Sequence, residues 1–344
     1  MTGAVRVAVT LEQCWHRIPG GVARAALESV RALVTTHPEI DQIGVSARHQ
    51  RPPGPAWRPA VSVRALPLPR IVLYETWHRL RWPAVQVATG AVDVIHATGM
   101  AVPPRSAPLV VTVHDLAFLD DERSGTRHGR RFFHRSAELA RREADLVVVP
   151  SQATLDDCVA RGFERERLRL VPWGIEIAAA SPAEIAAVRR RHRLDRPFVL
   201  WAGTIEPRKN LPTLLDAFAG LEERGVELVL AGPAGWNEDL DARLARLGNR
   251  VRTLGFVSPD ELRALYAAAE VFCFPSLREG FGLPVLEAMA QGTAVITSAS
   301  TATAEVAGDA GVLVEPRDPA AVAEALAGLL GDPERRRRLG AAAL

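Results

Sequence analysis

Short runs that are apolar throughout, rather than alternately apolar and polar, recur along the whole chain of 344 residues. A strand covered by helices on both faces of its sheet needs such a run, so the pattern predicts parallel sheets. Helical patterns, such as 22–35 and 128–142, lie between the runs and predict an α/β protein. The expected strands are 5–9, 92–97, 108–113, 144–150, 167–172, 198–203, 226–232, 250–255, 270–275, 294–298 and 311–316.

A stretch without periodicity, 172–182, interrupts this alternation, and the pattern then restarts. We therefore predict two doubly wound, Rossmann-like domains, 1–175 and 176–344, each of ordinary domain size. Ligands of such sheets bind beyond the carboxyl ends of the strands. We expect the two domains to face each other across a central cleft that holds the ligand.

Composition narrows the class of protein. A hydrophobic content of 48% is that of a globular chain with a large core, and a net charge of +2 is too small to indicate a nucleic-acid partner. The three cysteines lack metal-binding spacing, which favours a reducing compartment. No signal peptide and no membrane-spanning run is evident, so we expect a cytoplasmic protein. The arginine-rich segment 128–143 leaves two alternatives open: a peripheral contact at the inner face of the membrane, or a solvated helix with its aromatic residues packed inward.

Residues 276–292, SLREGFGLPVLEAMAQG, form the strongest site signal. A buried strand, a glycine turn and a short helix follow one another here, which aims the free N–H groups of the helix N-terminus beyond the strand end. Glu279 is expected in the turn and Glu287 one turn into the helix. Two carboxylates on either side of an anion site match a diphosphate that joins two hydroxyl-bearing rings, as in a nucleotide sugar.

Lys209 is the only lysine among 42 basic residues. With Arg208 it follows the strand 198–203, and a solitary lysine in an arginine-rich chain indicates a site that needs a compact ammonium group. The two cations could stabilise a departing diphosphate; the alternative is that both are solvated surface charges. The sequence shows no DxD motif and no acidic cluster with magnesium spacing, so we expect a reaction that needs no metal and no cofactor.

The first domain contributes further candidates at strand ends. His114 and Asp115 follow the strand 108–113, and Gly20 and Gly21 begin a helix where the backbone can approach an anion closely. A core histidine held by the backbone is the alternative for His114, and Asp115 is expected to be a turn or cap residue. The tryptophans suit either an acceptor cleft or structural roles: Trp15, Trp57, Trp77 and Trp82.

Taken together, these pieces resemble family 4 of the retaining glycosyltransferases, which have the two-domain GT-B fold. The matching segments cover nearly the whole chain in the family's order: PGGVARAALE, VTVHDLAF, PSQATLDDC, LRLVPWGIE, GTIEPRKNL and the E-x7-E segment. The resemblance implies transfer of a hexose, with retention of configuration, from a nucleoside-diphosphate sugar bound by the second domain, 176–344, to a glycan or lipid-linked acceptor bound by the first domain, 1–175. The form GTIEPRKN is similar to mannosyltransferase members, which makes GDP-mannose the first expected donor.

The resemblance also implies roles for the candidate residues. Glu279 would bind the hydroxyls of the donor sugar, Glu287 would bind the ribose, and His114 would lie beside the sugar at the reaction centre. The diphosphate would be held by Lys209 and Arg208 and by the backbone of the glycine turn, Gly280, Phe281, Gly282 and Leu283.

The chain departs from the family pattern at its C-terminal end, at Thr204 and at Glu176, where an aspartate is common. Thr204 stands where many members have an arginine, and the chain stops at RRRRLGAAAL, where members continue with a helix that returns to the first domain, so we expect a truncated sequence. Two other functions stay open: a non-catalytic nucleotide-sugar-binding or assembly subunit, and a GT-B sugar-nucleotide epimerase, which needs no acceptor.

Overall fold

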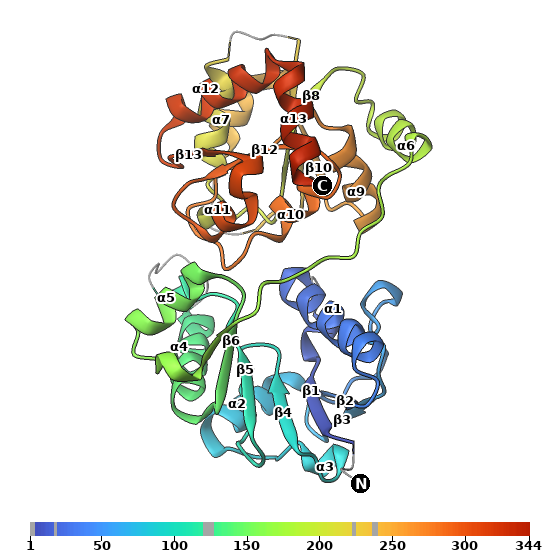
Figure 1. Ribbon diagram of the computed structural model, residues 1–344, viewed down its shortest axis with the longest axis vertical. Helices are drawn as coiled ribbons and strands as arrows, with labels where there is room; N and C mark the ends of the chain where they lie inside the picture. The colour runs from blue at the N-terminus through green and yellow to red at the C-terminus, as the bar shows by residue number, and fades with distance from the viewer. Residues whose placement is uncertain (1–3, 17–18, 120–126, 222–224, 236–239) are drawn as a thin grey trace. The chain divides into compact units, whose positions relative to one another are not determined.

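The computed structural model describes residues 4–16, 19–119, 127–221, 225–235 and 240–344 (Figure 1). The chain divides into two compact units, residues 1–174 and 175–344, and each is described by itself. Both units are sheets of parallel strands with helical connections, as predicted. No helix in the described ranges is long and apolar enough to cross a membrane.

The first unit is built on a seven-stranded sheet in the order β3-β2-β1-β4-β5-β6-β7, with every neighbouring pair parallel. Its strands are β1 (Arg6–Thr10), β2 (Asp41–Ser46), β3 (Val63–Ala65), β4 (Val94–Ala97), β5 (Leu109–Thr112), β6 (Leu146–Val149) and β7 (Leu168–Leu170). Its helices are η1 (Glu12–Trp15), α1 (Gly20–Thr36), η2 (Pro55–Trp57), α2 (Arg70–Leu80), α3 (Gln86–Thr89), η3 (Ala117–Leu119), α4 (Arg127–Glu143), α5 (Gln152–Ala160) and η4 (Arg165–Arg167).

The second unit is built on a six-stranded sheet in the order β10-β9-β8-β11-β12-β13, again parallel throughout. Its strands are β8 (Phe198–Ala202), β9 (Glu227–Ala231), β10 (Val251–Gly255), β11 (Val271–Phe274), β12 (Ala294–Ser298) and β13 (Gly311–Val314). Its helices are α6 (Pro182–His192), η5 (Pro207–Lys209), α7 (Leu211–Ala219), α8 (Asp241–Leu247), η6 (Gly248–Arg250), α9 (Pro259–Ala268), α10 (Leu283–Met289), α11 (Ala302–Ala307), η7 (Gly308–Ala310), α12 (Pro319–Leu330) and α13 (Pro333–Ala343).

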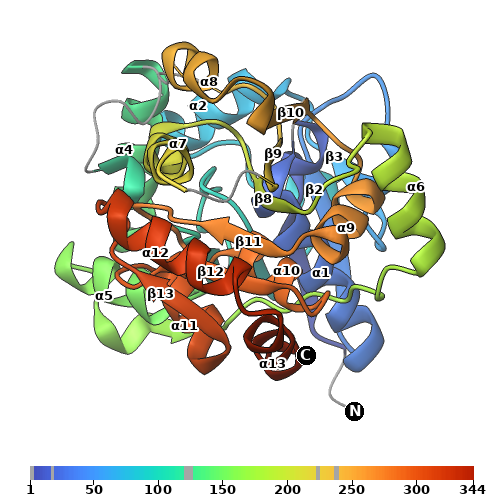
Figure 2. The same ribbon diagram turned by 90° about the horizontal axis from the view of Figure 1, so that it is seen from above.

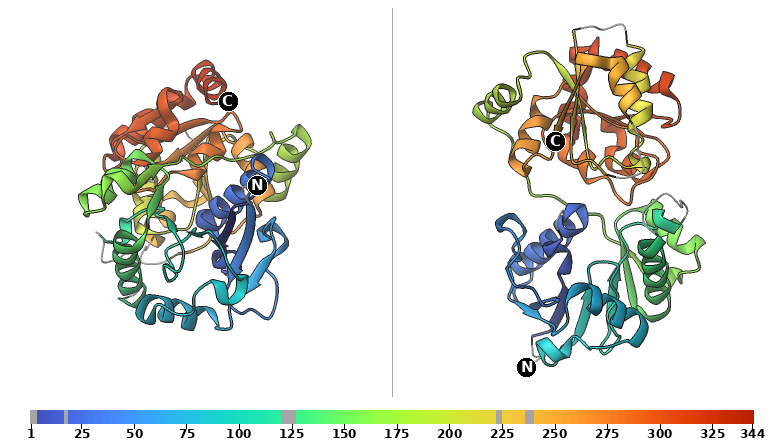
Figure 3. Two further views of the ribbon diagram at one scale, coloured as in Figure 1. Left: turned by 60° about the horizontal axis from the view of Figure 1, so that its bottom comes forward. Right: turned by 180° about the vertical axis from the view of Figure 1, so that it is seen from behind.

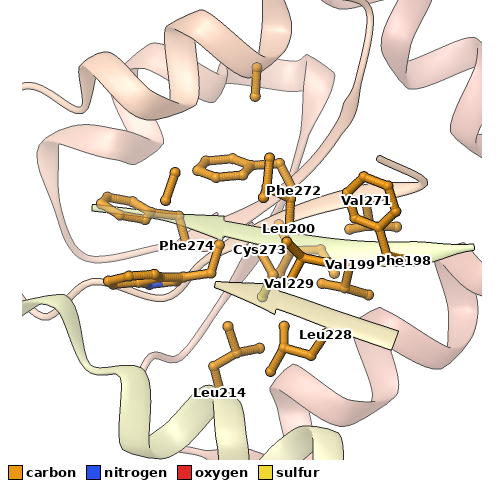
Figure 4. Packing of buried hydrophobic residues seen from close by; sticks show 14 of the residues in the cluster. Phe198, Val199, Leu200, Leu214, Leu228, Val229, Val271, Phe272, Cys273 and Phe274 are labelled. Atoms are coloured by element: carbon orange, nitrogen blue, oxygen red, sulfur yellow. The ribbon is translucent and has the colours of Figure 1, made fainter. Parts of the chain in front are cut away.

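Helices cover both faces of the second sheet, which the right-hand view of Figure 3 shows nearly edge-on. Helix α7 packs against α8 and α12, whereas α9 packs against α6 and α10, and α6 and α9 lie side by side in Figure 2. This double cover explains why the strands are apolar along their whole length. Phe198, Leu200 and Phe272, for example, have no exposed surface, and Figure 4 shows side chains of β8, β9 and β11 on both sides of the sheet.

Each sheet has one point at which the strand order reverses, and these points locate the ligand-binding edge. In the second unit the reversal lies between β8 and β11, so the loops that follow these two strands diverge to opposite faces. In the first unit it lies between β1 and β4. There the loops are joined by hydrogen bonds, since Thr98 N donates to Thr10 Oγ1 at 3.1 Å and Gln13 Nε2 donates to Thr98 Oγ1 at 2.7 Å.

Candidate functional site

The loops after β8 and β11 bring the predicted charged residues of the second unit together at the strand-order reversal. Lys209 ends η5, directly after β8, and Glu279 lies in the turn between β11 and α10. The Lys209 Nζ atom lies 2.5 Å from Glu279 Oε1, and the two side chains are only 8% and 7% exposed. The alternative of solvated surface charges is therefore wrong for Lys209.

Further polar groups complete what we call the strand-end cluster: Glu206, Arg208, Lys209, Ser276 and Glu279. Arg208 bridges two carboxylates, because one of its terminal nitrogens lies 3.0 Å from Glu279 Oε2 and the other lies 2.7 Å from Glu206 Oε1. The Ser276 hydroxyl donates to Glu279 Oε1 at 2.6 Å. Two cations thus face two carboxylates, and the cluster is close to neutral as it stands.

Burial and neighbouring charges shift the pKa values of both Lys209 and Glu279. Burial, together with the neighbouring Arg208 guanidinium, lowers the pKa of Lys209 against the opposing effect of Glu279. Burial alone would raise the pKa of Glu279, but Lys209, Arg208 and the Ser276 hydroxyl outweigh it and lower that pKa. The carboxylate is therefore anionic at neutral pH and is held in one orientation by three donors.

Sequence reasoning missed three residues here: Glu206 and Ser276, which belong to the cluster, and Asn210, which supports it. Asn210 has a left-handed backbone conformation, with φ of 54°, which asparagine tolerates better than most residues. Its Nδ2 donates to Pro275 O at 2.9 Å and to Pro316 O at 2.5 Å, so it ties the end of η5 to the loops after β11 and β13. The signal for it was an asparagine directly before a helix that has a proline in its first turn.

The glycine turn that leads into α10 requires glycine at Gly282. Its φ is 110°, and a Cβ atom there would lie 2.7 Å from Thr303 Cγ2. The residues of the turn, Gly280, Phe281, Gly282 and Leu283, are buried, and α10 begins at Leu283 as the strand–turn–helix prediction requires. The turn therefore follows Glu279 directly in the chain and belongs to the same loop between β11 and α10.

Glu287 lies inside α10 and is buried, with 6% of its surface exposed. The Tyr266 hydroxyl, from the end of α9, donates to Glu287 Oε2 at 3.2 Å. Glu287 is therefore not a solvated carboxylate on the surface. A buried carboxylate with a fixed hydroxyl donor keeps one orientation, which suits recognition of a ligand hydroxyl.

The first unit holds His114 in the loop after β5, also buried. Its Nε2 lies 2.8 Å from Thr98 O, so this nitrogen carries the hydrogen, while Nδ1 has no hydrogen-bond partner among the described residues. The ring packs against Trp173 at a centroid distance of 5.0 Å. Burial lowers the pKa of His114, so the imidazole is neutral at pH 7 and offers only a lone pair at Nδ1.

The remaining candidates of the first unit lie at helix starts. Gly20 and Gly21 are exposed and begin α1, and Gly20 has a φ of 64°. Asp115 accepts a hydrogen bond from Ala117 N at 3.1 Å, which confirms the turn role expected for it. These residues and the strand-end cluster belong to different units of the chain.

The aromatic residues of the first unit have mostly structural contacts. Trp77 is buried and donates to Pro83 O at 2.9 Å, whereas Trp15 stacks on His49 at 4.9 Å. Trp82 is exposed. In α4 the ring of Phe132 stacks on His78 at 4.3 Å and that of Phe133 packs on Phe118 at 4.8 Å, so the aromatic residues of this basic helix point inward.

Metal ligands do not gather anywhere in the described ranges, where no group of three or more His, Cys, Asp or Glu side chains is placed to hold an ion. The three cysteines, Cys14, Cys158 and Cys273, are buried and free. The cationic groups of the strand-end cluster are Lys209 and Arg208.

Two family models match the chain in succession. The model "Glycosyltransferase Family 4" matches residues 19–179, and the model "Glycosyl transferases group 1" matches residues 184–344. The junction between the two matches falls at the start of α6.

Curated relatives are named glycosyltransferases. O-antigen chain mannosyltransferase B of Escherichia coli is 34% identical over 67% of this chain and 63% of its own length. MMP alpha-(1->4)-mannosyltransferase of Mycolicibacterium hassiacum is 34% identical over 73% of this chain and 65% of its own length. In both cases the match spans less than two thirds of the relative. D-inositol 3-phosphate glycosyltransferase of Salinispora tropica is 31% identical over 93% of this chain and 76% of its own length.

Solved structures show the same fold over almost the entire chain. HepE of Anabaena, in a crystal structure with UDP and glucose, superposes with a TM-score of 0.76 at 22% identity, covering 98% of this chain and 93% of that one. WaaG, described as a glycosyltransferase involved in lipopolysaccharide biosynthesis, superposes with a TM-score of 0.73 at 18% identity, covering 98% and 94%. These similarities confirm the predicted GT-B fold.

Proposed function

The chain belongs to glycosyltransferase family 4, and on that basis we propose that it is a retaining hexosyltransferase that uses a nucleoside-diphosphate sugar. The observation that carries the proposal is the strand-end cluster, in which Lys209 and Arg208 are fixed beside Glu279 at the strand-order reversal of the second sheet. Mannose from GDP-mannose is the first candidate for the transferred group, because two of the relatives are named mannosyltransferases. The acceptor is a glycan or a lipid-linked glycan.

The cations of the cluster would bind the diphosphate by exchanging partners. In the structure Lys209 and Arg208 are paired with Glu279 and Glu206, so both are already oriented before any ligand arrives. A diphosphate that takes over these two donors would release the oxygens of Glu279 to accept hydrogen bonds from the hydroxyls of the sugar. Donors fixed in advance are usually the largest single contribution to catalysis.

The other residues would position the two ends of the donor. The backbone of the glycine turn, Gly280 to Leu283, would contact the diphosphate, and Glu287, oriented by Tyr266, would accept from the ribose hydroxyls. Thr204 supplies no charge at the position where many members have arginine, so Arg208 would provide the second cation. His114 would lie beside the sugar, with its Nδ1 lone pair as a hydrogen-bond acceptor.

We propose front-face attack as the route to retention. The bond between the sugar C1 and the phosphate oxygen breaks, the bond from C1 to the acceptor oxygen forms on the same face, and the acceptor proton passes to the departing phosphate. The negative charge that develops on the diphosphate would be stabilised by Lys209 and Arg208. In this proposal the two cations take the part that a metal ion plays in other transferases.

The test is the fate of the donor itself. GDP-mannose, UDP-glucose, UDP-GlcNAc and ADP-glucose are each incubated with the chain in EDTA, and the products are followed by chromatography and by NMR at early times. We expect slow release of nucleoside diphosphate and of the α-hexose from one donor. An isomerised nucleotide sugar would show an epimerase instead, a β-hexose would contradict retention, and binding without release would show a non-catalytic subunit.

A further inference from the structure

Three buried residues tie the carboxyl end of β1 to the loop after β4, at the strand-order reversal of the first sheet: Thr10, Gln13 and Thr98. We call them the β1–β4 clamp. Thr98 N donates to Thr10 Oγ1 at 3.1 Å, and the Thr98 hydroxyl donates to Thr10 O. The same hydroxyl accepts from Gln13 Nε2 at 2.7 Å. The Thr98 side chain therefore both donates and accepts inside the clamp.

The clamp ends on His114, in the loop after the neighbouring strand β5. Thr98 O accepts from His114 Nε2 at 2.8 Å, so Thr98 carries both the side-chain bonds of the clamp and the carbonyl that holds the imidazole. His114 Nδ1 is buried and has no hydrogen-bond partner among the described residues. A buried acceptor without a partner costs free energy, so stability alone does not account for this orientation of the ring.

Two other buried histidines of the first unit show what the carbonyl contributes. His96 Nε2 lies 2.8 Å from the Thr112 hydroxyl, and His78 Nε2 accepts from Val102 N at 3.3 Å. A hydroxyl can donate or accept, so it leaves both tautomers of His96 open, and a backbone N–H places the hydrogen of His78 on Nδ1. A carbonyl only accepts, so it places the hydrogen of His114 on Nε2.

Thr98 acts at one remove from any ligand. A cavity of about 360 Å³ opens at this edge of the first unit, and Thr10, Gln13 and His114 are among the described residues that line it. Thr98 is not among them. An effect of its side chain on a ligand in the cavity would therefore pass through the residues that Thr98 holds.

We propose that Thr98 is a positioning residue for hexosyl transfer. The β1–β4 clamp fixes the Thr98 carbonyl, the carbonyl keeps the hydrogen of His114 on Nε2, and Nδ1 thereby stays an acceptor for a hydroxyl of the donor sugar. The inference rests on the proposed function, in which His114 lies beside the sugar. A carbonyl released from the clamp lets the imidazole shift or turn over, and a displacement of about 1 Å at a reaction centre can cost up to about 10²-fold in rate.

The first measurement follows the Nε2 hydrogen itself, by NMR of the full chain with isotope-labelled histidine and no ligand. His114→Ala identifies the signal. Thr98→Val keeps the side-chain shape and removes the hydroxyl, so we expect this hydrogen to exchange with water about ten-fold faster or more, the equivalent of one lost hydrogen bond. Thr98→Ser restores the hydroxyl and should restore the wild-type rate. A wild-type rate in Thr98→Val would overturn the inference.

Thr89→Val is the matched control. Thr89 is also buried in the first unit, and its hydroxyl donates within the end of α3, to Val85 O at 3.2 Å and to Gly90 O at 2.9 Å. The loss of this hydroxyl should lower stability but leave the exchange of the His114 hydrogen and donor turnover unchanged. Faster exchange in Thr89→Val, equal to that in Thr98→Val, would show a general loosening of the unit and would overturn the inference.

Donor turnover shows whether Thr98 acts through His114. In the assay of nucleoside-diphosphate release, Thr98→Val should lower kcat about ten-fold or more and leave the KM for the donor unchanged, with recovery in Thr98→Ser. In the His114→Ala background the same substitution should lower kcat no further, because residues that act as one unit are not additive. An equal loss with and without His114 would make the role of Thr98 structural and overturn the inference.

A second variant serves if Thr98→Val does not fold. Gln13→Leu removes one bond of the clamp and keeps the Thr98 hydroxyl bonded to Thr10, and it should also speed exchange of the His114 hydrogen. Unchanged exchange in Gln13→Leu would then overturn the inference. A wild-type chain that releases no nucleoside diphosphate from any donor would overturn the proposed function instead, and the exchange rates would still decide whether the clamp holds His114.

Discussion

Lys209 lies against Glu279 in a chain whose other basic residues are all arginine. A buried ion pair is weak evidence for stability, because the desolvation of both charges offsets much of their attraction. The same sheet has a second buried, paired carboxylate at the amino end of its strand β9. There the buried carboxylate of Glu227 is held by Arg196 at 2.8 Å and by Arg252 at 3.2 Å. Both carboxylates are buried and each is paired with two cations, but only Glu279 lies at the carboxyl ends of the strands, where such a fold binds its ligand.

We predict that Lys209→Met and Arg196→Met separate function from stability. Each variant removes one of two cations from a buried carboxylate, so each should lower the free energy of unfolding by about 1–3 kcal/mol. Lys209→Met should also lower kcat by about 10²–10³, as does the loss of a single fixed donor to a developing anion. Urea denaturation and donor turnover measure the two effects. If Arg196→Met reduced turnover as strongly as Lys209→Met, the role of Lys209 would be structural.

At the scale of elements, the turn into α10 fixes the backbone that follows Glu279 in the proposed donor site. Gly282 combines a positive φ of 110° with a side-chain position that Thr303 already occupies. Gly308, at the end of α11, also has a positive φ, of 49°, but nothing lies within 4 Å of a Cβ atom placed there. The two glycines therefore distinguish backbone strain from steric overlap.

We predict different results for alanine at these two positions. Gly308→Ala should cost about 1–3 kcal/mol, because its φ of 49° with a ψ of −139° is a backbone conformation that only glycine adopts readily. Gly282→Ala should cost about 1–3 kcal/mol because Thr303 must move, and it alone should weaken donor binding. Thermal unfolding and donor titration check both variants. Donor affinity that is unchanged in Gly282→Ala would remove the turn from the site.

The sequence predicted the elements that are apolar throughout and missed those that are not. All eleven expected strands are present, but β2 and β3 were not predicted, since DQIGVS and VRA mix polar and apolar residues. The edge position of β3 explains its composition, because only one neighbour covers it. The positions of Lys209 and Glu279 at strand ends were predictable from the pattern. Their direct contact was not, since it depends on β8 and β11 being neighbours in the sheet.

At the scale of the whole molecule, the two units differ in their histidines. Eight of the nine lie in residues 1–174, and only His192 lies beyond them. Burial lowers the pKa of three of the eight, His16, His78 and His96, to about 4, and it also lowers the pKa of His114. The shifted carboxylates of the second unit, Glu184, Glu261 and Glu279, have pKa values below their ordinary 4.5.

We predict that acid destabilises the first unit before the second. An unfolded histidine binds a proton below about pH 6.5 and the buried ones do not, so stability is full above that pH and falls toward pH 4. Each strongly shifted histidine should cost on the order of 1–3 kcal/mol by pH 4. The carboxylates of the second unit stay ionised over most of this range. Hydrogen exchange at pH 7 and pH 5, corrected for intrinsic rates, should show protection lost first in residues 1–174. Earlier loss in residues 175–344 would contradict the prediction.

The central claim is that the strand-end cluster binds a nucleotide sugar, and calorimetric titration of the four donors in EDTA tests it most directly. The account predicts that one donor binds the wild type, that Lys209→Ala and Glu287→Ala each abolish this binding, and that Arg196→Met retains it. Absence of binding by all four donors, or binding that survives both alanine substitutions, would contradict it.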